Sequence, residues 1–338
     1  MNDLKFGKRD KRGNWTPQGT LQTGPLFELP PKPVAILKWL PGYFLPWNLL
    51  FMASACVFWF WLTPDWQTLK TLNWQWAGLL LLRNMLAVFL FYGAFELRLY
   101  VQRRQGSRFK FNAKFPSDTK SDIFFFGRQN VDNMIRAFGT GVPIWTAYEV
   151  LILWAFANAY VPTADLPANT WWLAVIALLL PLFHELHFYL IHRAIHIQLL
   201  YKHIHSVHHN SINPSPWSSL SMHPIEHLLY FSGSLIHLLI HSHPLLAIYH
   251  LHFVGFGAVV GHVGFDKIET GDESAIDTHA FAHYLHHKYF EVNYADGGIP
   301  LDRWFGTWHD GTKAGDELME ARWQKKRDRM NASMEAEK

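Results

Sequence analysis

The sequence predicts an all-α integral membrane protein with about four transmembrane helices and a helical cap that carries a histidine-rich site. Three observations predict this class. Four apolar runs approach the roughly 20 residues that a helix needs to cross a bilayer. Hydrophobic residues make up 49% of the 338-residue chain and charged residues only 17%, whereas soluble proteins usually have about 25% charged residues. All 21 histidines lie between His184 and His309.

The N-terminal segment, residues 1–33, is polar and basic and ends in the proline-rich run 29–33. We expect a loosely ordered tail here, because proline removes a backbone donor and such runs seldom pack. The first long apolar run begins near Tyr43, too far into the chain for an ordinary cleaved signal sequence. We therefore interpret that run as a retained membrane anchor.

The transmembrane region is assigned to residues 34–180. Its four apolar runs cover residues 43–62, 76–99, 138–161 and, reaching past that boundary, 171–191. A fifth apolar run, residues 228–262, is interrupted by Gly233, Pro244 and six histidines. That run is compatible with a re-entrant pair of half-spans and with helices that lie against the membrane. A large soluble helical protein is the alternative for the whole chain, and four runs of this length disfavour it.

The basic residues indicate how the spans are oriented. The connection between Arg98 and Arg136 contains nine Lys or Arg residues, whereas the loops 63–75 and 162–170 contain only Lys70. Lys and Arg accumulate in cytoplasmic loops, so both termini and the histidine clusters are predicted to be cytoplasmic. The membrane would be the inner or plasma membrane in a bacterium and an ER-type membrane in a eukaryote.

The composition also excludes several kinds of site. The formal net charge of +3 is too small for a nucleic-acid-binding surface. Cys56 is the only cysteine, so neither an intrachain disulfide nor a CxxC metal site can form. The glycines form no GxGxxG motif and no P-loop, so we expect no nucleotide site. Any bound metal must be held by nitrogen or oxygen atoms.

Three histidine boxes have the spacing of a helix face. The first is the pair His192 and His196, and the other two are HxxHH motifs at residues 205–209 and 283–287. Residues three and four apart are neighbours on a helix, so the pair can reach one point and each HxxHH places three imidazoles on one face. Eight imidazoles exceed the four to six ligands of one ion and indicate two. Imidazole binds iron, zinc, copper and nickel, so the ligand type leaves the element open. Surface histidines or a proton relay are the alternatives.

The boxes and their surroundings resemble the fatty acid hydroxylase/sterol desaturase superfamily of membrane di-iron oxidoreductases. The segments that carry the resemblance are 189–196, 201–210, 213–217, 222–226, 261–262, 283–287, 293–294 and 302–307. On this basis residues 181–312 are assigned to a fatty acid hydroxylase-like di-iron catalytic region and residues 313–338 to a charged C-terminal tail. The resemblance implies two iron ions, O2 as co-substrate, and hydroxylation or desaturation of a C–H bond of a lipid or sterol.

The resemblance also implies a set of site residues. Nine metal ligands are expected: His192, His196, His205, His208, His209, His262, His283, His286 and His287. His262 joins the set because it matches an isolated histidine of the family. A metal-bound imidazole needs a partner for its second nitrogen, and the candidates for this role or for further ligation are His187, His223, Glu226 and Asp302. His237, His241 and His243 are interpreted as interfacial or lining residues.

Oxidation of a C–H bond by O2 takes two electrons from outside the substrate. The sequence contains no dinucleotide fingerprint and no cysteine set for an iron–sulfur cluster, so we expect a separate donor, a ferredoxin or a small cytochrome with its reductase. Arg103, Arg104, Arg108 and the run 325–327 are candidates for docking it. Anchoring to anionic lipid headgroups explains the same residues equally well.

Two other functions remain as alternatives. Residues 223–227 fit the HxxEH motif of a zinc hydrolase, but Pro224 belongs in the first turn of a helix and this reading leaves both HxxHH boxes unexplained. A non-enzymatic metal transporter or sensor would need polar ligands along its spans, which contain few. Arg83 and Glu96 in the second span are expected to pair with each other or to reach the interface.

Overall fold

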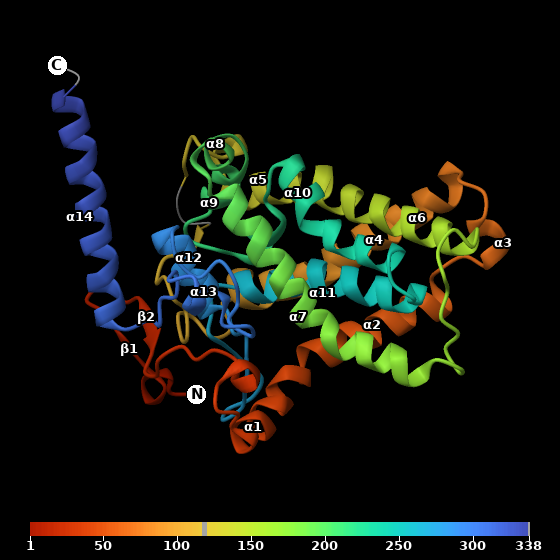
Figure 1. The fold of residues 1–338 in the computed structure, drawn as a ribbon. Coiled ribbons are helices and arrows are strands. Elements are labelled where there is room, and N and C mark those ends of the chain that lie inside the picture. The colour runs from red at the N-terminus through yellow and green to blue at the C-terminus, as the bar shows by residue number, and fades with distance from the viewer. Residues whose placement is uncertain (117–119, 337–338) are drawn as a thin grey trace.

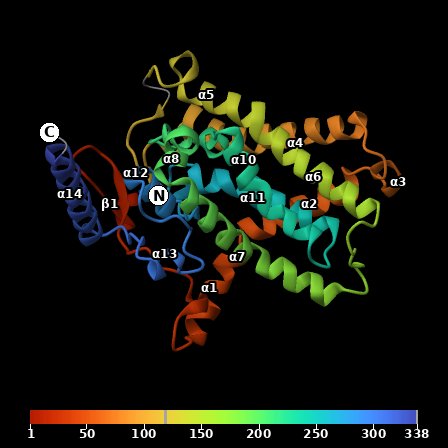
Figure 2. The same ribbon diagram turned by 45° about the horizontal axis from the view of Figure 1, so that its top comes forward.

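The computed structural model describes residues 1–116 and 120–336 and confirms the all-α class. A bundle of long apolar helices joins, at one end, a cap of short helices and hairpins where both termini lie (Figures 1 and 2). In the described residues four helical segments are long and apolar enough to cross a membrane: Trp74–Val101, Gln129–Ala157, Thr170–Ile195 and Pro244–His262. These helices make the chain an integral membrane protein.

The first predicted span, residues 43–62, is not one straight helix. It falls on α1 (Pro33–Phe44) and α2 (Trp47–Trp61), whose axes differ by 42°. The residue before a proline is disfavoured in the helical region, and Leu45, which precedes Pro46, is extended with ψ 140°. At 15 residues, α2 alone is shorter than the roughly 20 that a span needs. Only the bent pair together is long enough to cross.

The next three predicted spans agree better with the helices. The second and fourth coincide with α4 (Trp74–Phe95), which continues as the π-helical turn η3 (Glu96–Val101), and with α7 (Thr170–Ile195). The third begins nine residues before residue 138, since α5 (Gln129–Arg136) and η6 (Ala137–Gly141) run into α6 (Val142–Ala157). The apolar pattern did not include α5, because its charged side chains lower the hydropathy of this segment. Two of them form an ion pair within the helix, Arg136 Nε to Asp132 Oδ2 at 2.8 Å.

The fifth apolar run contains the central helix of the bundle. After the short α10 (Pro224–Phe231) and η9 (Ser232–Leu238), α11 (Pro244–His262) runs unbroken for 19 residues. It packs against α2, α6 and α7 (Figure 1), and a Cβ on Gly255 would lie 2.2 Å from the Trp145 ring. A helix buried on all sides is apolar all round. Residues 244–262 of the run therefore form one unbroken helix inside the bundle rather than a pair of half-spans.

Charges inside the bundle are paired, although with other partners than expected. Arg83 donates to Glu149, and Asn84 Nδ2 donates to the same carboxylate at 2.9 Å. Glu96 accepts from Asn130 Nδ2 at 2.7 Å. The expected pairing of Arg83 with Glu96 is therefore wrong, and each polar group faces another helix, as is usual within a membrane.

The cap contains most of the short elements. Two antiparallel hairpins are formed by β1 (Gly7–Arg9) with β2 (Trp15–Pro17) and by β3 (Lys267–Glu269) with β4 (Ala275–Asp277). The helices of the cap are η7 (Tyr201–His205), α9 (Ser206–His209), α12 (Phe281–Tyr289), α13 (Leu301–Trp304) and α14 (Lys313–Ala336). The remaining short helices are η1 (Asp3–Lys5), η2 (Pro25–Phe27), α3 (Trp66–Leu69), η5 (Phe125–Gly127), α8 (Gln198–Leu200) and η8 (Pro216–Leu220).

The N-terminal segment is more ordered than its composition predicts. Trp15 is fully buried and lies edge-on to Phe109, with ring centroids 5.4 Å apart. Arg9 forms an ion pair with Asp3 at 2.5 Å, and the first hairpin packs on the loop that follows η3. Phe109, in the loop after η3, thus supplies an apolar surface that residues 1–33 alone do not reveal.

Candidate metal centre

The histidine boxes lie where the bundle meets the cap. His192 belongs to the last turn of α7, and His196 follows its end. The second box spans η7 and α9, the third lies on α12, and His262 is the last residue of α11. Helices that are distant in sequence therefore deliver their histidines to one region.

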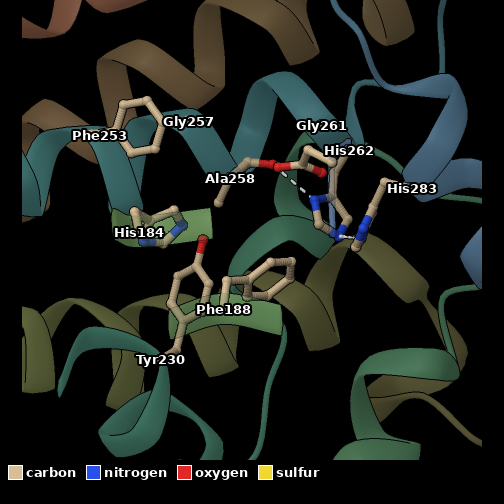
Figure 3. A pocket seen from close by; sticks show the side chains of 10 residues that line it. His184, Phe188, Tyr230, Phe253, Gly257, Ala258, Gly261, His262 and His283 are labelled. Carbon is tan, nitrogen blue, oxygen red and sulfur yellow. Dashed lines mark hydrogen bonds between the residues drawn. The ribbon is translucent and has the colours of Figure 1, made fainter. Parts of the chain in front are cut away.

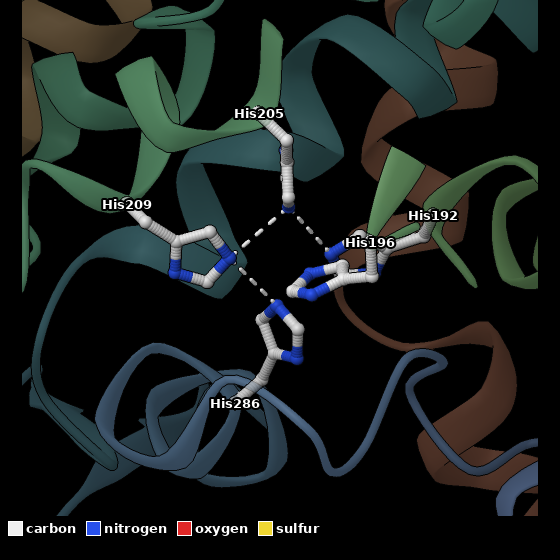
Figure 4. A group of neighbouring side chains, drawn as sticks. All are labelled: His192, His196, His205, His209 and His286. Atoms are coloured by element: carbon white, nitrogen blue, oxygen red, sulfur yellow. Dashed lines mark hydrogen bonds between the residues drawn. The ribbon is translucent and has the colours of Figure 1, made fainter. Parts of the chain in front are cut away.

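The structure places all nine histidines predicted as ligands in two adjoining groups. The five-histidine group is His192, His196, His205, His209 and His286 (Figure 4), and the four-histidine group is His208, His262, His283 and His287. Within each group, one ring nitrogen of every member lies within 4.8 Å of those of the others. Each HxxHH box is divided between the groups, because its middle histidine lies about 100° around the helix from the last one. Each HxxHH box therefore supplies histidines to both groups.

The second ring nitrogen of several members is held by an acceptor. His192, His208, His262 and His286 direct Nδ1 to the carbonyl oxygens of Tyr294, Ser221, Ala258 and Val292, at 2.8, 3.3, 2.8 and 2.7 Å. A carbonyl oxygen only accepts, so Nδ1 carries the proton in these rings. Each Nε2 atom consequently presents a lone pair to the centre of its group.

These lone pairs fit a cation. The Nε2 atoms of His208 and His262 are 3.2 Å apart, and those of His262 and His283 are 2.9 Å apart. Acceptor lone pairs at such distances repel each other unless a cation lies between them. Two nitrogens bound to one ion at about 2.0–2.1 Å, with a bond angle between about 90° and 109°, would be about 2.8–3.4 Å apart, which agrees with these contacts. The donor set therefore fits one metal ion in each group.

Burial keeps the box imidazoles neutral. It lowers the pKa of His205, His208, His209, His283, His286 and His287 well below the usual 6.5, and neighbouring histidines add to the effect. A metal binds the neutral form of imidazole. At neutral pH the site therefore needs no deprotonation before it accepts an ion.

The four additional candidates occupy different positions. Glu226 faces the centre, and its Oε1 lies 2.7 Å from Nδ1 of His205. Asp302 touches no histidine; it accepts from the backbone N–H groups of Tyr294 and Ala295 at 3.0 and 2.9 Å. It thereby fixes the loop whose Tyr294 carbonyl faces His192.

His223 and His187 lie apart from both groups. His223 caps α10, where its Nδ1 accepts from the N–H of Ile225 at 3.2 Å, and His187 Nε2 contacts Ser232 Oγ at 3.0 Å. His227, the other histidine of the HxxEH motif, directs Nε2 to the Leu220 carbonyl at 3.1 Å. Because Glu226 faces His205, the three residues of that motif do not share one site.

A small apolar cavity adjoins the four-histidine group. It has a volume of about 90 Å³, and Figure 3 shows His262 and His283 on one side of it and His184, Tyr230 and Phe253 on the other. Asp296 also lines it. No sequence pattern indicates His184, Tyr230 or Asp296 as site residues, since only the packing of α7, α10, α11 and the loop after α12 brings them to the box histidines.

Comparison with known proteins agrees with this geometry. Residues 177–307 match the fatty acid hydroxylase family model. A Delta(7)-sterol 5(6)-desaturase of Aspergillus fumigatus is 34% identical over 44% of this chain and 53% of its own. A putative methylsterol monooxygenase of Dictyostelium discoideum is 31% identical over 37% and 47%, and a fatty acid hydroxylase of Mycosarcoma maydis is 34% identical over 37% and 31%.

These matches confirm the resemblance to the fatty acid hydroxylase/sterol desaturase superfamily. The matched family segment contains all nine box histidines. The chain spans about half the length of the first of these relatives and less of the other two. No solved structure gives a significant match to the chain.

Proposed function

We propose that this protein is a membrane-bound, O2-dependent di-iron oxidoreductase that hydroxylates or desaturates a C–H bond of a lipid or sterol. The observation that carries the proposal is the pair of histidine groups whose Nε2 lone pairs converge beside an apolar cavity. Relatives named as sterol desaturases and a fatty acid hydroxylase support the reaction class. Hydroxylation and desaturation both begin at a C–H bond, and the chain's residues do not discriminate between them.

The nine box histidines would hold the two ions. Five nitrogens in one group and four in the other leave open positions on an ion that takes up to six ligands. Iron bound there would supply the oxidising chemistry that activates O2. The four-histidine group has more open positions and borders the cavity, so we place the substrate on its side.

The protein's own residues orient the ligands and keep water away. The carbonyl partners of Nδ1 fix the ring planes and the tautomer of the imidazoles, and Glu226 does the same for His205 with a carboxylate. Phe188, Phe253 and the small residues Gly257 and Ala258 line the cavity. These side chains have no groups that react with an oxidant, and they suit a hydrocarbon segment.

The two alternative functions are less compatible with the geometry. A zinc hydrolase built on residues 223–227 lacks a shared centre, because each of its polar side chains faces a different partner. A transporter needs ligands along the membrane path. In the described residues both convergent histidine groups lie at the cap end of the bundle, which suits chemistry at the membrane surface.

The electrons would come from a separate protein on the cytoplasmic side, where we place both termini and the boxes. Arg108 is less suited to docking than expected, because it forms a two-pronged ion pair with Glu269 at 2.8 and 2.7 Å. Lys326 and Arg327 on α14 form exposed ion pairs with Glu291 and Glu320. Exposed pairs of this kind are weak and can exchange partners, so α14 remains a candidate docking surface.

Turnover with and without an electron donor tests the function. Protein in lipid nanodiscs, loaded with iron, would be incubated with a bacterial or cellular lipid extract, O2 and reduced ferredoxin, and the lipids analysed by mass spectrometry. We expect a gain of one oxygen or a loss of two hydrogens in one lipid, repeated turnover only with the donor, and no product from His286→Ala. Sustained turnover without donor, or products of hydrolysis, would overturn the proposal.

A further inference from the structure

A second cavity adjoins the one beside the four-histidine group. We call the cavity of about 90 Å³ the inner chamber and this second one, of about 340 Å³, the outer chamber. Three residues line both chambers: His184, Phe253 and Asp296. The two cavities therefore adjoin at these three residues, and the outer chamber lies on the side away from the box histidines.

One wall of the outer chamber lies at the break between α1 and α2, and residues 22–24 and His279 of the cap line another part of it. The wall at the break consists of Trp39, Gly42, Tyr43, Trp47 and Asn48. The surface around this break is apolar: the side chains of Val34, Leu37, Leu45 and Leu49 are 65%, 66%, 53% and 57% exposed. Apolar side chains exposed on a membrane protein face lipid. The outer chamber therefore lies between the inner chamber and a surface that faces lipid.

Two polar residues, His184 and Asp296, line both chambers. In the described residues Nδ1 of His184 has no hydrogen-bond partner, and Asp296 is the carboxylate at the junction whose hydrogen-bonding capacity is unused. Two nearby carboxylates are engaged with the backbone of its own loop: Glu185 accepts from Gly297 and Ile299 at 2.7 and 2.9 Å, and Asp302 accepts from Ala295 at 2.9 Å. Among the described residues, 1–116 and 120–336, no side chain or backbone group donates a hydrogen bond to the Asp296 carboxylate.

The surroundings of Asp296 show where its carboxylate is directed. Its side chain is accessible and lines both chambers. The surrounding protein atoms and the nearby Asp302 raise the pKa of its carboxyl to about 6. The backbone N–H groups on both sides of it are fixed by Glu185 and Asp302. The Asp296 carboxylate is therefore held in a fixed position and is free to accept a hydrogen bond from a molecule in the chambers.

We propose that Asp296 anchors the polar group of the substrate, accepting a hydrogen bond from a hydroxyl or amino group of the lipid. This inference rests on the proposed function and adds the class of substrate. An ionised carboxylate only accepts hydrogen bonds and repels anions, so it selects lipids with a donor over esters, ethers and phosphates. The Tyr230 hydroxyl does not compete for this role, since it donates to the Val254 carbonyl at 3.0 Å.

The sizes of the two chambers indicate which carbon is oxidised. The inner chamber has about a quarter of the volume of the outer one, so only a short segment of the lipid fits beyond Asp296. Most of the molecule stays in the outer chamber, between α1, α2 and α7. The oxidised carbon therefore lies within a few bonds of the anchored hydroxyl or amino group, beside His262 and His283.

Binding of matched lipids tests the anchor. Iron-loaded protein in nanodiscs would be titrated with cholesterol, cholesterol methyl ether, octadecylamine and octadecyl methyl ether, and bound lipid measured by native mass spectrometry. We expect the wild type to prefer each donor over its ether by about 10-fold, as for hydrogen bonds to a charged group. Asp296→Ala should bring this ratio close to one. Asp272→Asn, at an exposed acid outside both chambers, should leave it unchanged.

The isosteric variant Asp296→Asn separates the two donor groups. An amide oxygen still accepts from a hydroxyl but does not compensate an ammonium charge, so preference for the amine should fall about 10-fold while preference for the hydroxyl is kept. If Asp296→Ala does not fold, Asp296→Asn still tests whether Asp296 anchors the donor group. Unchanged preference for both donors in a folded variant would overturn the anchor.

The outcome for the anchor is distinguishable from that for the proposed function, because binding needs no turnover. Donor preference that depends on Asp296, without any oxidised product, would retain the anchor and reject the oxygenase. Oxidised product, together with a donor preference that does not change in the Asp296 variants, would retain the oxygenase and reject the anchor. Where product forms, its oxidised carbon should lie within a few bonds of the donor group, and a distant position would also overturn the anchor.

Discussion

Two sets of buried histidines in this protein differ in one respect. The box histidines are the nine members of the two groups, and the bundle histidines are His184, His237, His250 and His252. All four bundle histidines are at most 7% exposed, as deeply buried as most box histidines. Yet only the box histidines bring one nitrogen each to a common point within 4.8 Å.

The bundle histidines have other neighbours. His237 Nδ1 lies 2.7 Å from Ser242 Oγ, and His252 Nδ1 lies 2.8 Å from Ser54 Oγ. Their rings pack against other rings, with centroids 5.4 Å apart for His237 and His250 and 4.5 Å for His252 and Phe58. Burial of a histidine therefore does not by itself indicate a ligand, whereas convergence of Nε2 lone pairs does.

The largest difference between the sets should appear on removal of a ligand. His286→Ala should abolish activity or lower it at least about 10-fold, since loss of a ligand or its outer partner typically costs 10- to 100-fold. The wild type should contain two metal ions per chain by elemental analysis, and the variant fewer. One ion per chain in the wild type, or full activity in His286→Ala, would contradict the assignment of the box histidines.

Acid should destabilise the metal-free protein through the box histidines. Burial keeps the folded pKa of His208, His283 and His287 well below 6.5, so below pH 6.5 the unfolded chain binds more protons and stability falls. Each such histidine should lower the free energy of unfolding by more than about 1 kcal/mol at pH 5.5 and should have no effect above pH 7.5. Thermal unfolding in one detergent at the two pH values measures this, and equal midpoints would be inconsistent with neutral buried imidazoles.

The partner of His205 should affect metal affinity without removing a ligand. Glu226→Gln replaces the carboxylate 2.7 Å from Nδ1 and should weaken metal binding in the five-histidine group by about 10- to 100-fold. Competition with a chelator measures this affinity. Glu273→Gln, at an exposed position in the turn between β3 and β4, is the matched control, and equal affinities of the two variants would reject a role for Glu226.

A bundle histidine should affect stability alone. His237→Ala loses the contact with Ser242 and should destabilise the protein by about 1–3 kcal/mol, as measured by thermal unfolding. Its metal content should remain at two ions per chain. Loss of an ion in this variant would place the bundle histidines in the metal system and remove the distinction between the two sets.

The smallest effects are expected at His241 and His243. His241 is exposed, and its replacement by Ala should change stability by less than about 0.5 kcal/mol. His243 caps α11, its Nδ1 accepting from the N–H of Leu245 at 3.1 Å, so His243→Ala should cost about 1 kcal/mol. Neither variant should alter activity per folded molecule. A tenfold loss of activity in either variant would show that the end of the bundle far from the cap, where His241 and His243 lie, takes part in function.

Local patterns predicted much of the architecture. Apolar length located α4 and α7, and helical spacing located eight of the nine box histidines, because both properties depend on residues close together in the sequence. The ninth, His262, was expected only from the resemblance to the family. The same patterns were less informative for α11, whose histidines and Pro244 resemble a break until its neighbours are known. They also missed the order of residues 1–33, since Trp15 is buried by Phe109, about 90 positions away.

The sequence by itself determined the membrane class and eight of the nine histidines, since apolar length and i, i+4 spacing are properties of single helices, and the resemblance to the family added His262. Only the tertiary structure decided how those histidines divide into five and four, because the division depends on how α7, α9, α11 and α12 meet. It also decided that Glu226 serves His205 while Asp302 holds a loop. The position of Asp296 between two chambers depends in the same way on contacts between distant segments, and these follow from packing rather than from any local pattern.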